Sequence, residues 1–252
     1  MQGYFITFVN KTIGGTNKMQ YFKYNDFVNK VIELGFLFPP DKDTKGFPTI
    51  NDFVSEGQWW TNNPELDPWL WKDRVAEEKK LAYGSFFCGK KGFISPQFYS
   101  IFVDAFRPML TMEERWQSGK LGEFEWKFWN LITNENRPIG THEYRRMIEI
   151  PDNSRKSTLD AAVVNLQMTF DVTITGNIDM LDKKGMPYNK AEAFDKVDKW
   201  VPKEWLSLNQ HMNHEEALET IYSHTQHICN GLDVERIKKM FSKSLKLYKK
   251  FC

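Results

Sequence analysis

Residues 123–188 read EFEWKFWNLITNENRPIGTHEYRRMIEIPDNSRKSTLDAAVVNLQMTFDVTITGNIDMLDKKGMPY, and they form the clearest structural pattern in the chain. Turn residues at 137–140 (RPIG) and 151–154 (PDNS) divide the first part into three stretches, and Thr141 is suited to cap the middle one. The first and third stretches place apolar side chains at helical spacing: Phe124, Phe128, Leu131 and Ile132, then Leu159, Ala162, Val163 and Leu166. The pattern predicts three consecutive helices.

A hairpin is predicted directly after the third helix. Residues 170–175 alternate as a strand, residues 182–185 (DKKG) suit a tight turn, and residues 186–188 begin the returning strand. Three helices followed by a hairpin are typical of a winged helix, which lays one helix in a DNA groove and the hairpin on the neighbouring backbone. We therefore expect an α+β, mostly helical protein built from winged-helix (helix-turn-helix) units with short β-hairpin wings.

The third predicted helix, residues 154–168, would be the recognition helix of this unit. A helix that reads base edges needs Arg, Lys, Asn or Gln on its outward side. Asp160 flanks the outward side of this helix and would repel phosphates. The outward positions are instead small or apolar: Ser157, Ala161, Val164 and Met168. Only Arg155, Lys156 and Ser157 suit a backbone contact. The pattern favours packing of this helix against the other half of the protein.

Two predicted hairpin turns carry paired lysines. Lys90 and Lys91 precede Gly92, and Lys183 and Lys184 precede Gly185. Two cationic wings could straddle a duplex and neutralise phosphates without reading sequence. The alternative is that both are ordinary solvated turns, and the sequence leaves the two interpretations open.

Residues 49–75 contain four tryptophans, interrupted by Asn-Asn-Pro and Asp-Pro: Trp59, Trp60, Trp69 and Trp71. We predict a loop, not a regular helix, whose large rings cover a core or a domain seam. A stacking platform for an unpaired base is the alternative.

The remaining segments suggest two halves and a helical end. Other helices are predicted at 25–34, 96–106, 202–212, 214–230 and 233–248, and a hairpin at 83–94 with its turn at 88–92. A charged, glycine-containing break at 109–121 separates the halves. We expect an N-terminal half with the aromatic loop, hairpin and helix (1–120), a winged-helix unit (121–200), and a C-terminal helical segment that packs on the core (201–252).

Composition excludes several classes of protein. Lys plus Arg is 34 against 33 acidic residues, so any nucleic-acid contact needs a local basic patch. The three cysteines are scattered, which predicts a reducing, cytoplasmic location without disulfides. No stretch is long and apolar enough to predict a helix that spans a membrane, and no signal peptide is apparent.

No motif establishes an enzyme class. Nucleotide-binding loops, the hydrolase elbow and the zinc-protease motif are absent from the sequence. Four histidines lie close together, but their spacing does not match helical zinc motifs, so a solvated helix flank is favoured and we predict no metal and no cofactor: His211, His214, His224 and His227.

Several short motifs resemble the AlkZ-related protein family, small relatives of the AlkZ-like winged-helix DNA glycosylases. They are DPWLWKDR at 67–74, AYGSFF at 82–87, KGFIS at 91–95, STLDAAVVNLQ at 157–167 and GMPY at 185–188. The resemblance covers about residues 25–245 and implies winged-helix units and a relation to DNA repair. The glycosylases position water with Gln-x-Gln or Gln-x-Asp, and this chain contains neither. No catalytic residue is carried over.

Three functions are compatible with these observations. The first is DNA-backbone binding, with phosphates contacted by Lys90, Lys91, Arg155, Lys156, Ser157, Lys183 and Lys184. The second is a DNA repair glycosylase that holds a flipped damaged base in a cleft lined by Trp69, Trp71 and Tyr83. The third is a non-enzymatic scaffold that binds a protein partner through Ala161, Val164 and Met168. The oligomeric state is not indicated.

Overall fold

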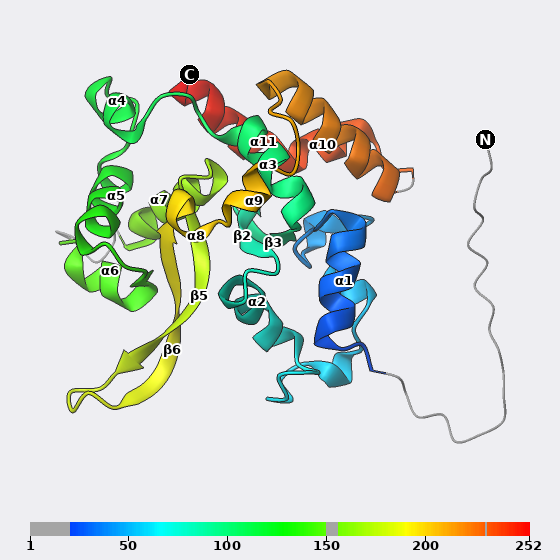
Figure 1. The fold of residues 1–252 in the computed structure, drawn as a ribbon, viewed down its shortest axis with the longest axis horizontal. Helices are drawn as coiled ribbons and strands as arrows, with labels where there is room; N and C mark the ends of the chain where they lie inside the picture. The colour runs from blue at the N-terminus through cyan, green and yellow to red at the C-terminus, as the bar shows by residue number, and fades with distance from the viewer. Residues whose placement is uncertain (1–20, 150–155, 230) are drawn as a thin grey trace.

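The computed structural model describes residues 21–149, 156–229 and 231–252. Helices predominate, and two three-stranded antiparallel sheets lie among them (Figure 1). The expected α+β, mostly helical fold class is confirmed. None of the helices in these ranges has the length and apolar character that crossing a bilayer requires.

The first sheet belongs to the N-terminal half. Helix α1 (Tyr24–Leu34) ends at Gly35, whose φ of +80° suits glycine, and β1 (Phe36–Leu37) follows directly. Three short 3-10 helices and α2 (Pro68–Glu77) lead to β2 (Ala82–Phe87) and β3 (Lys90–Ile94). The 3-10 helices span Lys42–Thr44, Ile50–Asp52 and Glu56–Gln58. The strands lie in the order β1-β3-β2.

Helix α2 corrects the last part, residues 68–75, of the loop predicted over residues 49–75. Pro68 occupies the first turn, and the Asp67 carboxylate accepts the backbone N–H of Trp69 at 3.0 Å. The interruption predicted at Asp-Pro is therefore a helix start, because proline at the first helical position lacks only an N–H group that would be unpaired there.

The β2–β3 turn is also tighter than predicted. Only Cys88 and Gly89 separate the two strands, and both have positive φ angles, of 55° and 82°. A two-residue turn of this kind matches the twist of a hairpin. Lys90, Lys91 and Gly92 consequently belong to β3 and not to the turn.

The second sheet follows a connecting region. Helix α3 (Pro96–Phe106) and the short α4 (Met112–Gln117) precede α5 (Glu123–Glu135), β4 (Ile139–Gly140), α6 (Thr141–Met147) and α7 (Lys156–Met168). The long strands β5 (Val172–Leu181) and β6 (Pro187–Lys196) complete the order β4-β6-β5. Both sheets thus share one arrangement, in which the third strand lies between the first and the second.

Four helices form the C-terminal region: α8 (Val197–Trp200), α9 (Lys203–Leu206), α10 (His214–Ile228) and α11 (Val234–Phe251). The predicted helix at 202–212 is wrong beyond Leu206. Trp205 is buried after one turn, and the Asn209 side chain donates to the Gln97 carbonyl and the Ser100 hydroxyl at 2.7 and 2.9 Å. These contacts attach the connection after α9 to the first turns of α3.

The buried side chains form two clusters that each mix residues from distant parts of the chain. Phe27, Trp71, Phe128 and Phe251 lie in one cluster, and Phe36, Phe102, Ile221 and Phe241 lie in the other. Arg115 and Asp171 form a buried ion pair, with Nη1 2.6 Å from Oδ2. The predicted division of the chain into three parts, at about residues 120 and 200, stays a prediction.

Candidate nucleic-acid interface

The β5–β6 hairpin projects from the body of the molecule (Figure 1). All residues from 181 to 190 are exposed. At the tip, the Asp182 carboxylate accepts the backbone N–H groups of Lys184 and Met186 at 2.8 and 2.9 Å, and Gly185 takes a φ of +78°. The turn therefore holds Lys183 and Lys184 at the far end of the hairpin.

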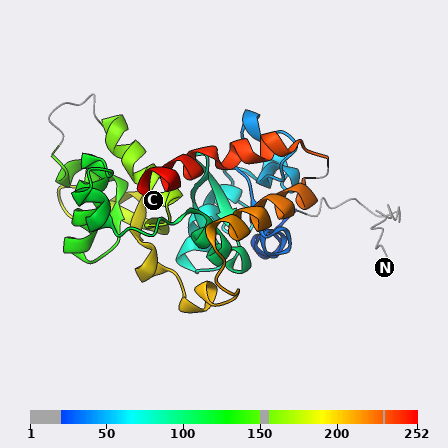
Figure 2. The ribbon, with the colours of Figure 1, turned by 90° about the horizontal axis from the view of Figure 1, so that it is seen from above.

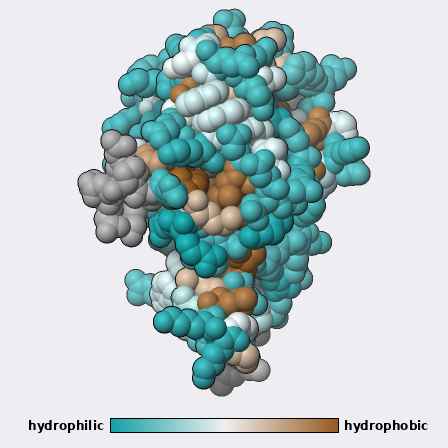
Figure 3. All heavy atoms as spheres, turned by 90° about the vertical axis from the view of Figure 1, so that its left-hand side faces the viewer, coloured by the Kyte–Doolittle hydropathy of each residue, from teal (hydrophilic) through white to brown (hydrophobic). Residues whose placement is uncertain are grey.

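The hairpin end also exposes large apolar side chains that are not among the residues predicted to contact DNA. Leu181, Met186 and Tyr188 are 58%, 62% and 63% exposed. Figure 3 shows the narrow lower end of this side of the molecule as a mixture of hydrophobic and hydrophilic residues. The sequence signal was available, because these apolar residues flank the DKKG turn. A hairpin that combines lysines with exposed apolar residues is suited to meet a partner surface.

The two lysine pairs have different surroundings. Lys90 Nζ lies 2.6 Å from Asp41 Oδ1 and 2.7 Å from Asp43 Oδ2. The hydrogen bond that Lys90 donates to Asp43 lowers the pKa of the Asp43 carboxyl. Lys91 Nζ lies 2.5 Å from both oxygens of Glu192, on β6. Lys90 and Lys91 therefore connect elements of the protein, whereas Lys183 and Lys184 extend into solvent.

The first turns of α7 are only partly described. Arg155 lies outside the described residues, as does the side chain of Lys156, which begins the helix. Ser157 is exposed. Asp160, expected to repel phosphates, is paired with Arg145 Nη2 at 2.6 Å and accepts the Tyr144 hydroxyl at 2.9 Å. Its charge is thus balanced locally.

The outward side of α7 packs on other elements, as predicted. Helix α7 contacts β2 and α11. Met168 is buried, Val164 is half-buried and only Ala161 is exposed. The scaffold hypothesis requires these three side chains to be open, and the structure leaves just one of them so.

The aromatic residues proposed to hold a base differ in accessibility. Trp71 is fully buried, stacks on Phe27 and donates its Nε1–H to the Pro64 carbonyl at 3.1 Å. Tyr83 is 7% exposed. Trp69 is 45% exposed, with Lys72 Nζ 4.6 Å from its ring centroid.

The exposed partner of Trp69 is Trp60 and not Trp71. The centroids of the Trp60 and Trp69 rings are 4.5 Å apart, and Trp60 is 64% exposed. Trp60 belongs to the predicted aromatic loop but not to the predicted stacking residues. Its position before Asn62-Asn63-Pro64 was the available signal of an exposed turn.

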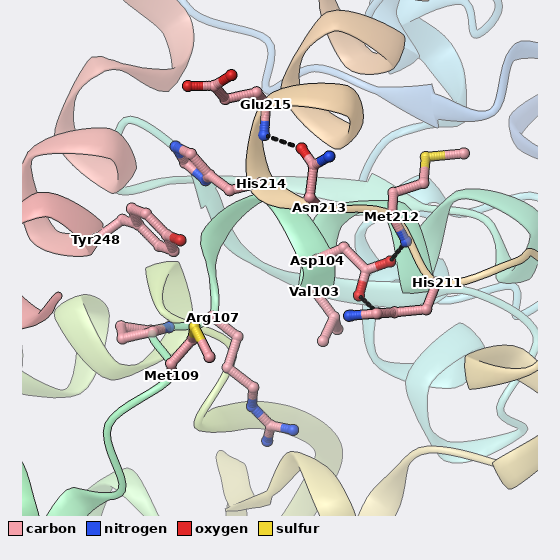
Figure 4. A pocket seen from close by; sticks show the side chains of 11 residues that line it. Val103, Asp104, Arg107, Met109, His211, Met212, Asn213, His214, Glu215 and Tyr248 are labelled. Atoms are coloured by element: carbon pink, nitrogen blue, oxygen red, sulfur yellow. Dashed lines mark hydrogen bonds and ion pairs between the residues drawn. The ribbon is translucent and has the colours of Figure 1, made fainter.

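A hollow of about 740 Å³ lies where α3, the start of α10 and the end of α11 meet (Figure 4). Asp104 Oδ1 lies 2.7 Å from His211 Nδ1, and its Oδ2 accepts the Met212 N–H at 2.9 Å. His214 Nδ1 lies 2.7 Å from the Ala105 carbonyl and its ring stacks on Tyr248. Both imidazoles are thereby oriented by an oxygen at Nδ1.

The described residues that line this hollow include no Ser–His or Cys–His pair. No serine, threonine or cysteine is among its lining residues, and the His211 side chain is 87% exposed. Within the described part of the chain, no group of three or more His, Cys, Asp and Glu side chains is placed to hold a metal ion. Asp104 thus orients the exposed imidazole of His211, but the lining residues include no serine, threonine or cysteine that this imidazole could activate.

The family model for AlkZ-related proteins matches residues 21–242. The chain belongs to the AlkZ-related family. No curated protein and no solved structure matches it. The family match suggests at most a relationship to the DNA glycosylases, and it identifies no site residue.

Proposed function

We propose that this AlkZ-related protein binds the backbone of double-stranded DNA through the β5–β6 hairpin, acting as the wing of a winged-helix unit. The observation that carries the proposal is the hairpin end, where ten consecutive exposed residues present lysines and large apolar side chains together. Lysines there supply a sequence-independent attraction to phosphates, and apolar side chains at such a tip can enter a groove.

The order of elements supports the winged-helix assignment. α5, β4, α6, α7, β5 and β6 follow one another as helix, strand, two helices and two strands, with the first strand paired to the last. The N-terminal half repeats the strand arrangement with α1 before its first strand and α2 before the hairpin. We infer two related units, of which the second has the longer and more exposed wing.

The wing has a fixed base, which is required if its tip is to be held against DNA. Glu192 on β6 is bonded to Lys91 on β3, and Glu77 of α2 accepts the Asn177 backbone N–H at 3.0 Å on β5. The inner part of the hairpin is thus attached to the other sheet and to α2, while residues 181–190 of its outer part are exposed. We assign no catalytic role, because no residue of the chain matches the family's Gln-x-Gln or Gln-x-Asp motif.

The test is the salt dependence of binding to a labelled 20-base-pair duplex. The double variant Lys183→Ala with Lys184→Ala is expected to make the negative slope of log K against log salt shallower by about 2, since each phosphate contact contributes about 0.9. Lys80→Ala with Lys203→Ala, two exposed lysines elsewhere, is the charge-matched control. Tyr188→Ala is expected to weaken binding without changing the slope. Wild-type affinity and slope in both wing variants would overturn the proposal.

A further inference from the structure

We infer that one face of α11 is a second phosphate-binding surface, formed by residues outside the wing. This helix carries seven cations and one acid between Val234 and Phe251, a net charge of +6. Five cations recur at alternating spacings of three and four residues: Arg236, Lys239, Lys243, Lys246 and Lys250. We call them the α11 cation row. At 1.5 Å per residue, the row is about 21 Å long and lies on one side of the helix.

Burial of a separate face of α11 leaves the row at the surface. Ile237, Met240, Phe241 and Phe251 are buried, and all five cations of the row are exposed. The apolar side chains that an interfacial helix would insert into lipid are therefore already in the core. What remains outside is a ridge of positive charge.

The row lacks acidic partners within the described residues. The ion pair formed on α11 joins Lys238 to Glu235, and Lys238 lies on a different side of the helix. Arg236 donates to a backbone carbonyl, that of Lys45, at 2.6 Å. Like charges four residues apart, such as Lys239 with Lys243, destabilise a helix when no anion is bound. A bound polyanion would remove this repulsion.

Two hollows lie beside the row, and residues of neighbouring elements form part of their lining. One, of about 430 Å³, is lined by Lys42, Asp43 and Lys90 beside Arg236, Lys239 and Lys243, and Lys90 is paired there with Asp43 at 2.7 Å. The other, of about 280 Å³, lies between the row and Asn165 and Met168 of α7. Figure 2 shows α11 crossing the upper side of the molecule with α7 beside its C-terminal part. The cations that the outward side of α7 lacks are thus supplied by the helix next to it.

The ligand that fits the row is the phosphate backbone of a nucleic-acid strand. A strand of duplex DNA presents one charge per about 3.4 Å of axis, so a linear set of five cations over about 21 Å matches a few successive phosphates. Flexible lysines suit such regularly spaced point charges and need no base contact. The inference deepens the proposed function by adding a second contact, but it rests on residues that the wing does not share.

The experiment compares three charge-matched double variants on the labelled 20-base-pair duplex over a range of salt concentrations. Lys243→Ala with Lys246→Ala removes the middle of the row, Lys183→Ala with Lys184→Ala removes the wing lysines, and Lys80→Ala with Lys203→Ala is the control. We expect the row variant to make the negative slope of log K against log salt shallower by about 2, while the control keeps the wild-type slope. Circular dichroism melting verifies that each variant is folded.

Each outcome has a defined meaning. A row variant with wild-type slope beside a weakened wing variant would overturn this inference and leave the proposed function standing. The reverse result would support the row and overturn the wing. If the row variant binds DNA normally but no longer binds vesicles containing phosphatidylserine, the surface recognises a membrane and the inference is wrong.

Discussion

At the scale of single residues, Asp67 organises the aromatic loop before α2. Its side chain is buried, and its oxygens accept the backbone N–H groups of Trp60, Asn62 and Trp69 at 3.1, 2.9 and 3.0 Å. Trp60 and Asn62 both have positive φ angles, of 63° and 57°, which are unfavourable for a bulky side chain. The carboxylate therefore holds a strained turn and presents Trp60 to solvent.

We predict that Asp67→Ala lowers the free energy of unfolding by about 3 kcal/mol, since it leaves several N–H groups unpaired and removes a helix cap. Urea denaturation measures the change. Asp67→Asn keeps one acceptor oxygen and should cost less. Equal stability of wild type and Asp67→Ala would show that the turn does not depend on the carboxylate.

Arg115 and Asp171 allow a similar test of a buried charge. Arg115 Nη1 and Nη2 lie 2.6 and 3.1 Å from the two Asp171 oxygens, and both residues are buried. Arg115→Met should lower the free energy of unfolding by about 3–5 kcal/mol, because it leaves a carboxylate buried and unpaired. Adding Asp171→Leu should restore part of that loss in a double-mutant cycle. Additive losses in the double variant would contradict coupling between the two residues.

His224 links stability to pH. Burial lowers the pKa of its imidazole, and Nε2 lies 2.8 Å from the Leu34 carbonyl. Because the folded pKa lies below the unfolded value of about 6.5, the unfolded state takes up a proton first as pH falls. The stability that the neutral His224 imidazole contributes is complete above the unfolded pKa, and it is lost as pH falls from there through the folded pKa.

We therefore expect wild type to lose more stability than His224→Gln when pH falls from about 7.5 to about 5. Denaturant melts of both proteins at several pH values measure this difference. Parallel stability curves would show that His224 does not titrate differently on folding.

At the scale of elements, the β2–β3 turn joins three parts of the molecule. A Cβ at Gly89 would lie 3.3 Å from Val164 of α7 and 3.9 Å from Lys243 Nζ of α11. With a φ of +82°, Gly89→Ala should lower the free energy of unfolding by about 1–2 kcal/mol. Gly57→Ala is the control, because a Cβ there has no atom within 4 Å. Similar stability of the two variants would argue against a required glycine at 89.

Sequence patterns predicted the helices whose apolar faces repeat regularly. Leu159, Ala162, Val163 and Leu166 are all buried in α7, because their spacing alone places them on one side. The full length of the wing was not predictable in the same way. Strands β5 and β6 continue beyond the body of the protein, where no buried face imposes an alternating pattern.

The candidate site was harder to predict because partners come from distant residues. Lys90 and Lys183 occupy similar local sequences, yet Lys90 meets Asp41 and Asp43 across the fold. Trp69 and Trp71 are two residues apart, and the turn of α2 directs one outward and the other into the core. The α11 cation row was visible in the sequence as an alternating three–four spacing, but its exposure depended on which face the core would cover.

At the scale of the whole molecule, charge is unevenly distributed. The chain carries a net charge of +1 and α11 carries +6, so the remaining residues together carry −5. A nearly neutral total therefore hides a concentrated positive surface, which is the arrangement needed to attract a polyanion locally. The wing lysines add a second positive site on a separate element.

The most direct measurement is the binding of wild-type protein to a labelled 20-base-pair duplex by fluorescence anisotropy, from about 50 to 200 mM salt. We predict binding that weakens steeply with salt, with a slope of log K against log salt of about −4.5 or steeper, because at least five cations contact phosphates. No binding at the lowest salt concentration, or binding that does not change with salt, would contradict the assignment of this protein as a DNA-backbone binder.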